Sequence, residues 1–149
     1  MSIELKKANE YEKAEQEKIP VEEKPAFHVA APVGWINDPN GFSWYQGQIH
    51  LFYQYHPYTT EWGPMHWGHS VSDDMIHWKN MPSVLAPDQE YDKRGCFSGS
   101  AVEKDGKHVL IYTGVSNVQM ENGSIQERQN QCIAVSYTHL RAHETELHL

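Results

Sequence analysis

The sequence predicts an all-β fold, two blades of a β-propeller, preceded by one N-terminal helix. Glu and Lys dominate residues 3–18, as in a solvated helix, whereas short aromatic stretches broken by turn residues begin at Phe27. From there the order hairpin, loop, third strand occurs twice, about 60 residues apart, which is typical of propeller blades. A β-sandwich is the structural alternative.

The N-terminal segment is expected to form a helix over residues 3–18. Ser2 can cap its first turn, and Pro20 would stop it. The stretch "PVEEKP" then forms a linker. Residues 1–24 are therefore interpreted as a helix and linker, an appendage that carries no visible chemistry.

The repeat is visible residue by residue. The predicted hairpin turns are Gln46–Gly47 and Asp105–Gly106, and aligning their glycines, a shift of 59, sets "LFY" against "LIY". Residues 68–72 ("GHSVS") and 132–136 ("CIAVS") match at a shift of 64. Two blades cannot close a ring and would leave a sheet edge and face exposed. The chain is therefore expected to be a piece of a longer protein.

Composition and charge exclude several classes of protein. The net charge is −8, and no basic stripe suits nucleic acid. No apolar run approaches the roughly 18 residues of a membrane span, and the N-terminus lacks the apolar region of a signal peptide. Two cysteines, Cys96 and Cys132, do not make a disulfide framework. The sequence therefore predicts a cytoplasmic protein without a nucleic-acid or membrane partner, and it leaves the oligomeric state open.

The motif "WINDPNG", residues 35–41, allows two interpretations of Asp38. Asx-Pro and Asn-Gly pairs are strong turn signals, so a turn is expected here. A carboxylate held on a rigid turn at a strand end is also well placed for catalysis. The two interpretations are compatible.

The repeat suggests where a ligand would bind. In a propeller the innermost strands line a central channel, and a ligand meets the residues at one end of them. Asp38 lies just before the first inner strand, "GFSW", and Phe97 and Ser98 lie just before the second, "GSAV". Phe97 follows Asp38 by 59 residues, the shift of the hairpins. The repeat therefore directs "WIND" and "CFSG" at one axial pocket.

Four motifs, in this order and spacing, are similar to the start of glycoside hydrolase family 32 enzymes: "WINDPNG", "FYQYHP", "WGPMHWGHSVSDDMIHW" and "GCFSGSA". The resemblance covers residues 25–136. It implies a five-bladed propeller followed by a β-sandwich, of which this chain would hold the first two blades. It also implies hydrolysis of β-fructofuranosides, such as sucrose or sucrose 6-phosphate, with retention and without a cofactor.

By position, Asp38 resembles the nucleophile of that family. Retaining glycosidases use two carboxyl groups about 5–5.5 Å apart, one to attack the anomeric carbon and one to protonate the leaving oxygen. The nucleophile has to stay ionised, and backbone N–H groups of the "NDPNG" turn are expected to bind it. The side chains implied to contact the sugar or to line its pocket are Trp35, Ile36, Asn37, Gln54, Trp62, Phe97 and Ser98.

Several of these side chains have a plainer alternative role. Asn37 can form a local Asx-turn, and Gln54 can simply face solvent on its strand. Trp35 and Phe97 can belong to the packed core. The resemblance favours the sugar contacts.

No metal site is predicted. His66 and His69 have the spacing HxxH, but a strand would place them on opposite faces, and no Cys or Glu completes a zinc set. Asp88, Glu90 and Asp92 alternate in a loop, where exposure to solvent is expected rather than calcium binding.

The sequence departs from the family in two respects. The family's second Asp lies in an Arg-Asp-Pro motif and its acid/base Glu in a Glu-Cys motif, and neither motif occurs here. After Ser136 the resemblance ends abruptly, and residues 137–149, "YTHLRAHETELHL", are interpreted as foreign. A divergent third blade is the alternative for this tail.

Three functions fit these observations. The first is a truncated fructosidase that holds the nucleophile half of its site. The second is a non-catalytic fructoside-binding module. The third is a related five-bladed arabinan or xylan hydrolase, or a fructosyl transferase. "NDPNG" together with "FYQ" and "FSG" favours the first over the third.

Overall fold

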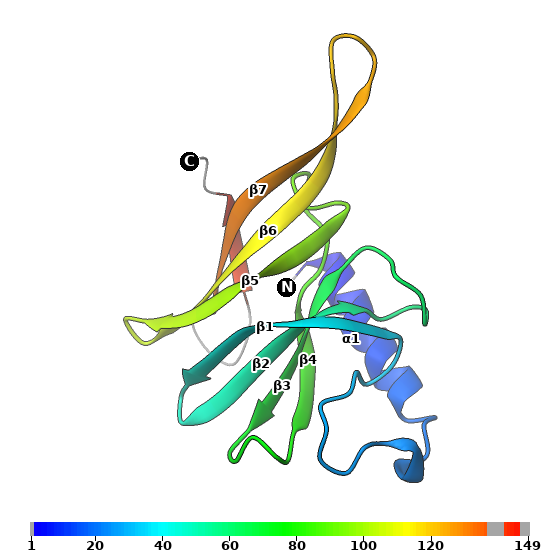
Figure 1. The fold of residues 1–149 in the computed structure, drawn as a ribbon, viewed down its shortest axis with the longest axis vertical. Helices are drawn as coiled ribbons and strands as arrows, with labels where there is room; N and C mark the ends of the chain where they lie inside the picture. The colour runs from blue at the N-terminus through cyan, green and yellow to red at the C-terminus, as the bar shows by residue number, and fades with distance from the viewer. Residues whose placement is uncertain (1, 137–141, 147–149) are drawn as a thin grey trace.

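The computed structural model describes residues 2–136 and 142–146, and in this part of the chain it holds one α-helix and two four-stranded antiparallel sheets (Figure 1). The helices are α1 (Ile3–Gln16) and the short 3₁₀ helix η1 (Val21–Glu23). The first sheet has the order β1 (Trp35–Tyr45), β2 (Gln48–His56), β3 (His66–Ser72) and β4 (Lys79–Leu85). The second has the order β5 (Gly95–Lys104), β6 (Lys107–Gln119), β7 (Ile125–Ser136) and β8 (Ala142–Glu146).

Both predicted hairpin turns are confirmed. Gln46 and Gly47 have φ angles of 49° and 79°, and Asp105 and Gly106 have φ angles of 53° and 73°. Two consecutive residues with positive φ make the turn type whose twist matches that of the flanking strands. Each turn therefore fixes the register of its hairpin.

The repeat also holds in the pairing between strands. Tyr53 of β2 lies opposite Gly68 of β3, and Tyr112 of β6 lies opposite Cys132 of β7. The first residues of the two pairs are 59 apart and the second residues 64 apart, which are the two shifts found in the sequence. The two sheets are therefore copies of one meander.

The two sheets meet through their first strands, since β1 and β5 run side by side (Figure 1). The backbone N–H of Cys96 donates to the carbonyl of Met65, at 2.8 Å, which joins the sheets directly. The buried core includes residues of both sheets: Phe52, Trp67, Val84, Leu85, Cys96, Leu110, Tyr112, Cys132 and Ala134. Neither sheet is an independent unit.

The apolar side chains on the two inner strands are not all covered. Phe42 and Trp44 of β1 are 59% and 62% exposed, and Val102 of β5 is 49% exposed. Large apolar side chains gathered on neighbouring strands usually mark a surface that contacts something else.

Residues 142–146 of the predicted foreign tail form β8, which pairs with β7 from Cys132 to Ser136. Residues 137–141 and 147–149 lie outside the described residues. The interpretation of residues 137–149 as foreign stays a prediction.

The N-terminal helix packs against the outer strand β4 and is not a detached appendage. Its Leu5, Ala8 and Glu12 are buried. Glu12 accepts a hydrogen bond of 2.5 Å from the hydroxyl of Ser83 on β4. The helix ends at Gln16, two residues before the predicted end, because its last turn passes into a bend ahead of Pro20.

The predicted N-cap of this helix is confirmed, because the Ser2 hydroxyl accepts a hydrogen bond from the Leu5 N–H at 3.1 Å. Replacing Ser2 with Ala is expected to lower the free energy of unfolding by about 1 kcal/mol. Urea unfolding followed by circular dichroism measures this change. Ser2→Asp, which keeps a capping oxygen, should match the parent, and a loss as large as that of Ser2→Ala would contradict the capping role.

Candidate functional site

The motif that carries Asp38 is a bulged strand, not a turn. Residues 35–41 all lie within β1, and its register with β2 shifts between Ile36 and Pro39. The turn prediction was wrong because β1 is an edge strand of its sheet, where a residue without an N–H is tolerated. The bulge takes up the extra residue, and bulges of this kind commonly re-aim a side chain beside an active site.

The side chains of the bulge face solvent. Asn37 and Asp38 are exposed, Ile36 is 38% exposed, and Trp35 is half-buried. Among the described residues no backbone N–H donates to the Asp38 carboxylate, so the expected hydrogen bonds within "NDPNG" are not formed. Asp38 is therefore accessible to a ligand from outside the sheet.

Gln54 is buried, so the alternative of a solvent-facing side chain is wrong. Its amide N–H donates to the carbonyl of Cys96 at 3.0 Å. Trp67, the residue opposite Gln54 on β3, donates from its indole N–H to the carbonyl of Phe97 at 3.1 Å. This cross-strand pair in the first sheet thus holds two successive peptides of β5.

Phe97 and Ser98 occupy the position on β5 that Asp38 occupies on β1. The register of β5 with β6 shifts between Phe97 and Ser100, so the second inner strand is also irregular there. Phe97 is half-buried and Ser98 exposed. The repeat therefore brings the two predicted segments onto neighbouring strands, while a shared pocket for Asp38, Gln54, Trp62 and Ser98 stays a prediction.

Trp62 lies in the loop between β2 and β3 and is 53% exposed. An exposed indole offers a flat apolar face, which suits stacking against a sugar ring. The predicted contact with the sugar is not tested by its position alone.

The histidines of the HxxH motif have separate surroundings, as expected for opposite faces of a strand. His66 bonds to the carbonyl of Pro64 at 3.1 Å, whereas His69 bonds to His50 at 3.0 Å. Within residues 2–136, no three His, Cys, Asp or Glu side chains are grouped so that they can hold a metal ion.

Asp92, five residues before Phe97, has surroundings that differ from those predicted. It was expected in a solvated loop, but it is fully buried. Burial raises the pKa of its carboxyl to about 6, against the opposing effect of its hydrogen bonds. Its burial results from Tyr112, a residue 20 positions later, whose hydroxyl donates to it at 2.9 Å.

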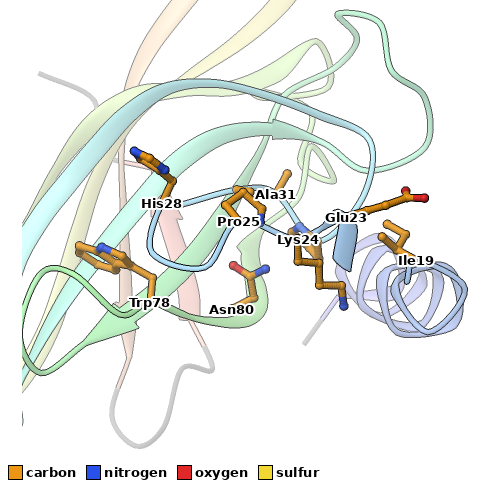
Figure 2. Close-up of a pocket in the computed structure, with 10 residues that line it drawn as sticks. Ile19, Glu23, Lys24, Pro25, His28, Ala31, Trp78 and Asn80 are labelled. Carbon is orange, nitrogen blue, oxygen red and sulfur yellow. The ribbon is translucent and has the colours of Figure 1, made fainter. Parts of the chain in front are cut away.

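A separate cavity of about 230 Å³ lies between the N-terminal segment and β4 (Figure 2). Its lining residues are Ile19, Glu23, Lys24, Pro25, His28, Ala30, Ala31, Pro32, Trp78 and Asn80. The Trp78 indole N–H already donates to Met75, and the Asn80 amide oxygen accepts from Ser70. None of the predicted sugar contacts lines this cavity.

The helices in the described part of the chain are all too short or too polar to span a bilayer.

Two four-stranded meanders that meet through their first strands have the arrangement of neighbouring blades in a β-propeller. The family model described as "Glycosyl hydrolases family 32 N-terminal domain" matches residues 28–146. The chain belongs to this family. The match runs past Ser136, where the resemblance was expected to end.

The similar proteins are fructoside-cleaving enzymes by name. The sucrose-6-phosphate hydrolase of Escherichia coli is 54% identical over 112 residues, which are 75% of this chain and 24% of that protein. The sucrose-6-phosphate hydrolase of Zymomonas mobilis is 45% identical over 133 residues, which are 89% of this chain and 26% of that protein. The chain thus spans about a quarter of the length of the curated relatives it matches.

A solved structure shows the same fold. The β-fructofuranosidase of Bombyx mori superimposes with a TM-score of 0.81 at 39% identity, over 95% of this chain and 29% of that one. A variant of the silkworm enzyme was solved in complex with sucrose, and it matches with the same TM-score.

Proposed function

We propose that this chain is the N-terminal part of a β-fructofuranosidase that releases fructose from sucrose or sucrose 6-phosphate with retention. Asp38 is its nucleophile. The observation that carries the proposal is the exposed Asp38 in the bulge of β1, the strand that runs beside β5, which carries the "CFSG" segment. The names of the relatives support the same class of substrate.

The chemistry divides between this chain and residues outside it. Asp38 attacks the anomeric carbon of the fructosyl group while the bond to the glycosidic oxygen breaks and the general acid protonates that oxygen; water then hydrolyses the fructosyl ester of Asp38, which releases fructose and restores the carboxylate. Trp35, Asn37, Trp62 and Ser98 contact the sugar. The general acid and the second Asp of the family come from further blades.

The uncovered surface supports a longer parent protein. Phe42, Trp44 and Val102 expose apolar surface on the inner strands. Three further blades, completing a five-bladed ring, would cover such a face, and a β-sandwich would follow. The 149-residue chain alone is expected to be marginally stable and to lack a closed pocket.

The test uses a chimera, called here the joined protein. In it, residues 1–136 of this chain are followed by the part of the E. coli sucrose-6-phosphate hydrolase that lies C-terminal to its matching region. The joined protein is expected to release fructose from sucrose. The 149-residue chain should release none, because general acid catalysis is worth about 10²–10⁴-fold and its acid is missing.

Three outcomes would contradict parts of the proposal. Binding of sucrose by a correctly folded joined protein without turnover would favour the fructoside-binding module. Turnover by the 149-residue chain clearly above its Asp38→Ala variant would show that a second carboxyl, such as Glu61 or Glu103, completes the site within this chain. A preference of the joined protein for a long fructan over sucrose and sucrose 6-phosphate would contradict the proposed substrate.

A further inference from the structure

Asp92 is a buried carboxyl group that the proposed reaction does not use. Its Oδ1 accepts a hydrogen bond from the Gln89 N–H at 2.8 Å, and its Oδ2 accepts one from the Tyr112 hydroxyl at 2.9 Å. The Cys96 thiol lies 3.7 Å from the same Oδ2. Asp92 thus connects the loop before β5, the start of β5 and the middle of β6.

The backbone around Asp92 leads directly into the candidate site. The Asp92 carbonyl accepts a hydrogen bond of 2.7 Å from the N–H of Gly95, the first residue of β5. Gly95 has φ 151°, and a Cβ there would lie 2.9 Å from the Phe97 ring. The chain therefore enters β5 at Gly95 directly from the turn that the Asp92 carbonyl closes, two residues before Phe97.

The same segment is held from its other side by the first sheet. Met65 accepts from the Cys96 N–H, Gln54 donates to the Cys96 carbonyl, and Trp67 donates to the Phe97 carbonyl. These contacts fix one side of the Cys96–Phe97 backbone. Asp92 provides the fixed point on the side of the second sheet.

Burying a carboxylate costs free energy, because the ionised group loses its hydration. Within the described residues no Lys, Arg or His forms an ion pair with Asp92, and burial raises the pKa of its carboxyl to about 6. Packed apolar residues often stabilise a core as well as buried charged groups do. The directional hydrogen bonds of a carboxyl group, however, fix a geometry that apolar contacts do not.

We propose that Asp92 is a positioning residue that, together with Tyr112, fixes the path of Gly95–Ser98 and so holds Phe97 and Ser98 in the sugar pocket. The sugar pocket itself rests on the proposed function. The positioning of the segment rests on the hydrogen bonds alone and can be measured without activity.

The first test is amide hydrogen exchange of the joined protein, followed by mass spectrometry. Asp92→Asn is expected to speed exchange in Gly95–Ser98 about tenfold or more, the factor expected when a hydrogen bond to a carboxylate is lost. Exchange in β3 should not change. Tyr112→Phe removes the hydroxyl that donates to Asp92 and leaves the sequence of the loop unchanged. It should also speed exchange in Gly95–Ser98.

The matched control is Asp88→Asn, which alters a half-buried carboxyl in the same loop. It should leave exchange in Gly95–Ser98 unchanged. Equal acceleration throughout both sheets in Asp92→Asn and Tyr112→Phe would show a general loss of stability and overturn the inference, as would no acceleration in either variant.

The second test measures steady-state kinetics of the joined protein. Asp92→Asn is expected to raise the KM for sucrose about fivefold or more with a smaller change in kcat, because the walls of the pocket move while the nucleophile stays. An active joined protein with unchanged exchange and KM would overturn the inference and leave the proposed function standing. A joined protein that is inactive but shows the local exchange effect would support the positioning role of Asp92 and contradict the proposed function.

Discussion

Replacing Asp38 with Asn in the joined protein is expected to lower the rate of fructose release from sucrose by about 10⁴-fold or more, the scale seen when a covalent nucleophile is removed. Asn keeps the size of the side chain but cannot attack the anomeric carbon. Since Asp38 is exposed and accepts no hydrogen bond from the described residues, its replacement should leave the fold intact. The melting temperature should therefore change little.

Two measurements make this result specific to the nucleophile. Asp105→Asn alters another exposed carboxyl, in a turn position with φ 53° that Asn tolerates, and should retain the parent rate. Azide added to Asp38→Ala should enter the vacated space and restore release of glucose, because a small anion can replace the missing carboxylate. A rate within tenfold of the parent in Asp38→Asn would exclude Asp38 as the nucleophile.

The parts of the fold that sequence alone predicted are those fixed by local signals. Gln46–Gly47 and Asp105–Gly106 adopt positive φ. Few residue pairs accept this conformation, so each pair predicts a hairpin turn from sequence alone. The two shifts of the repeat also hold for the third strands, where Tyr53 lies opposite Gly68 and Tyr112 lies opposite Cys132. The motif around Asp38 was likewise visible, although its bulge was not.

The parts that sequence did not predict depend on partners far along the chain. Asp92 is buried because Tyr112 reaches it from the next strand, and Glu12 is buried because Ser83, 71 residues later, donates to it. An acidic residue in a polar stretch looks solvated until its partner is known. The bulge at Asp38 depends in the same way on how β1 pairs with β2.

Three buried histidines lie where the two sheets meet, and a proton added to His69 or His108 would have no hydrogen-bond acceptor among the described residues. His50 donates from Nε2 to the carbonyl of Tyr45 at 3.2 Å, so its Nδ1 accepts from His69 Nε2 at 3.0 Å. Ser43 donates to a carbonyl and accepts from His108 Nε2 at 2.9 Å. Within the described residues Nδ1 of His69 and His108 has no partner.

Acid is therefore expected to destabilise the fold. Burial lowers the pKa of His66 and of His108 from 6.5 to about 4, and that of His69 well below 6.5. A group with a lowered pKa contributes stability that is present above its unfolded value and is lost as the pH falls toward the folded value. For His66 alone the loss between pH 6.5 and 4 is about 3 kcal/mol.

Two buried acids act in the opposite direction, because they destabilise the fold as the pH rises from about 4 to about 7. Burial raises the pKa of Glu12 from 4.5 to about 7, against opposing hydrogen bonds from Ser83, and that of Asp92 from 3.8 to about 6. Such groups contribute stability that is full below the unfolded pKa and is lost as the pH rises through the folded pKa. Ionising Glu12 between pH 4.5 and 8 costs about 3 kcal/mol of the docking of α1.

The free energy of unfolding of the 149-residue chain is therefore expected to rise from pH 4.5 to about pH 7 and to level off above it, because the buried His66, His69 and His108 outweigh the two buried acids over this range. Urea unfolding in dilute solution at pH 4.5, 6 and 8 measures the profile. Glu12→Gln removes an opposing group and should steepen the rise, whereas the exposed Glu10→Gln on the same helix should not. His66→Gln should flatten the rise, and His77→Gln, an exposed histidine, should not. A profile that falls from pH 4.5 to 8, or one that Glu12→Gln and His66→Gln both leave unchanged, would show that these buried groups do not govern the stability of the fold.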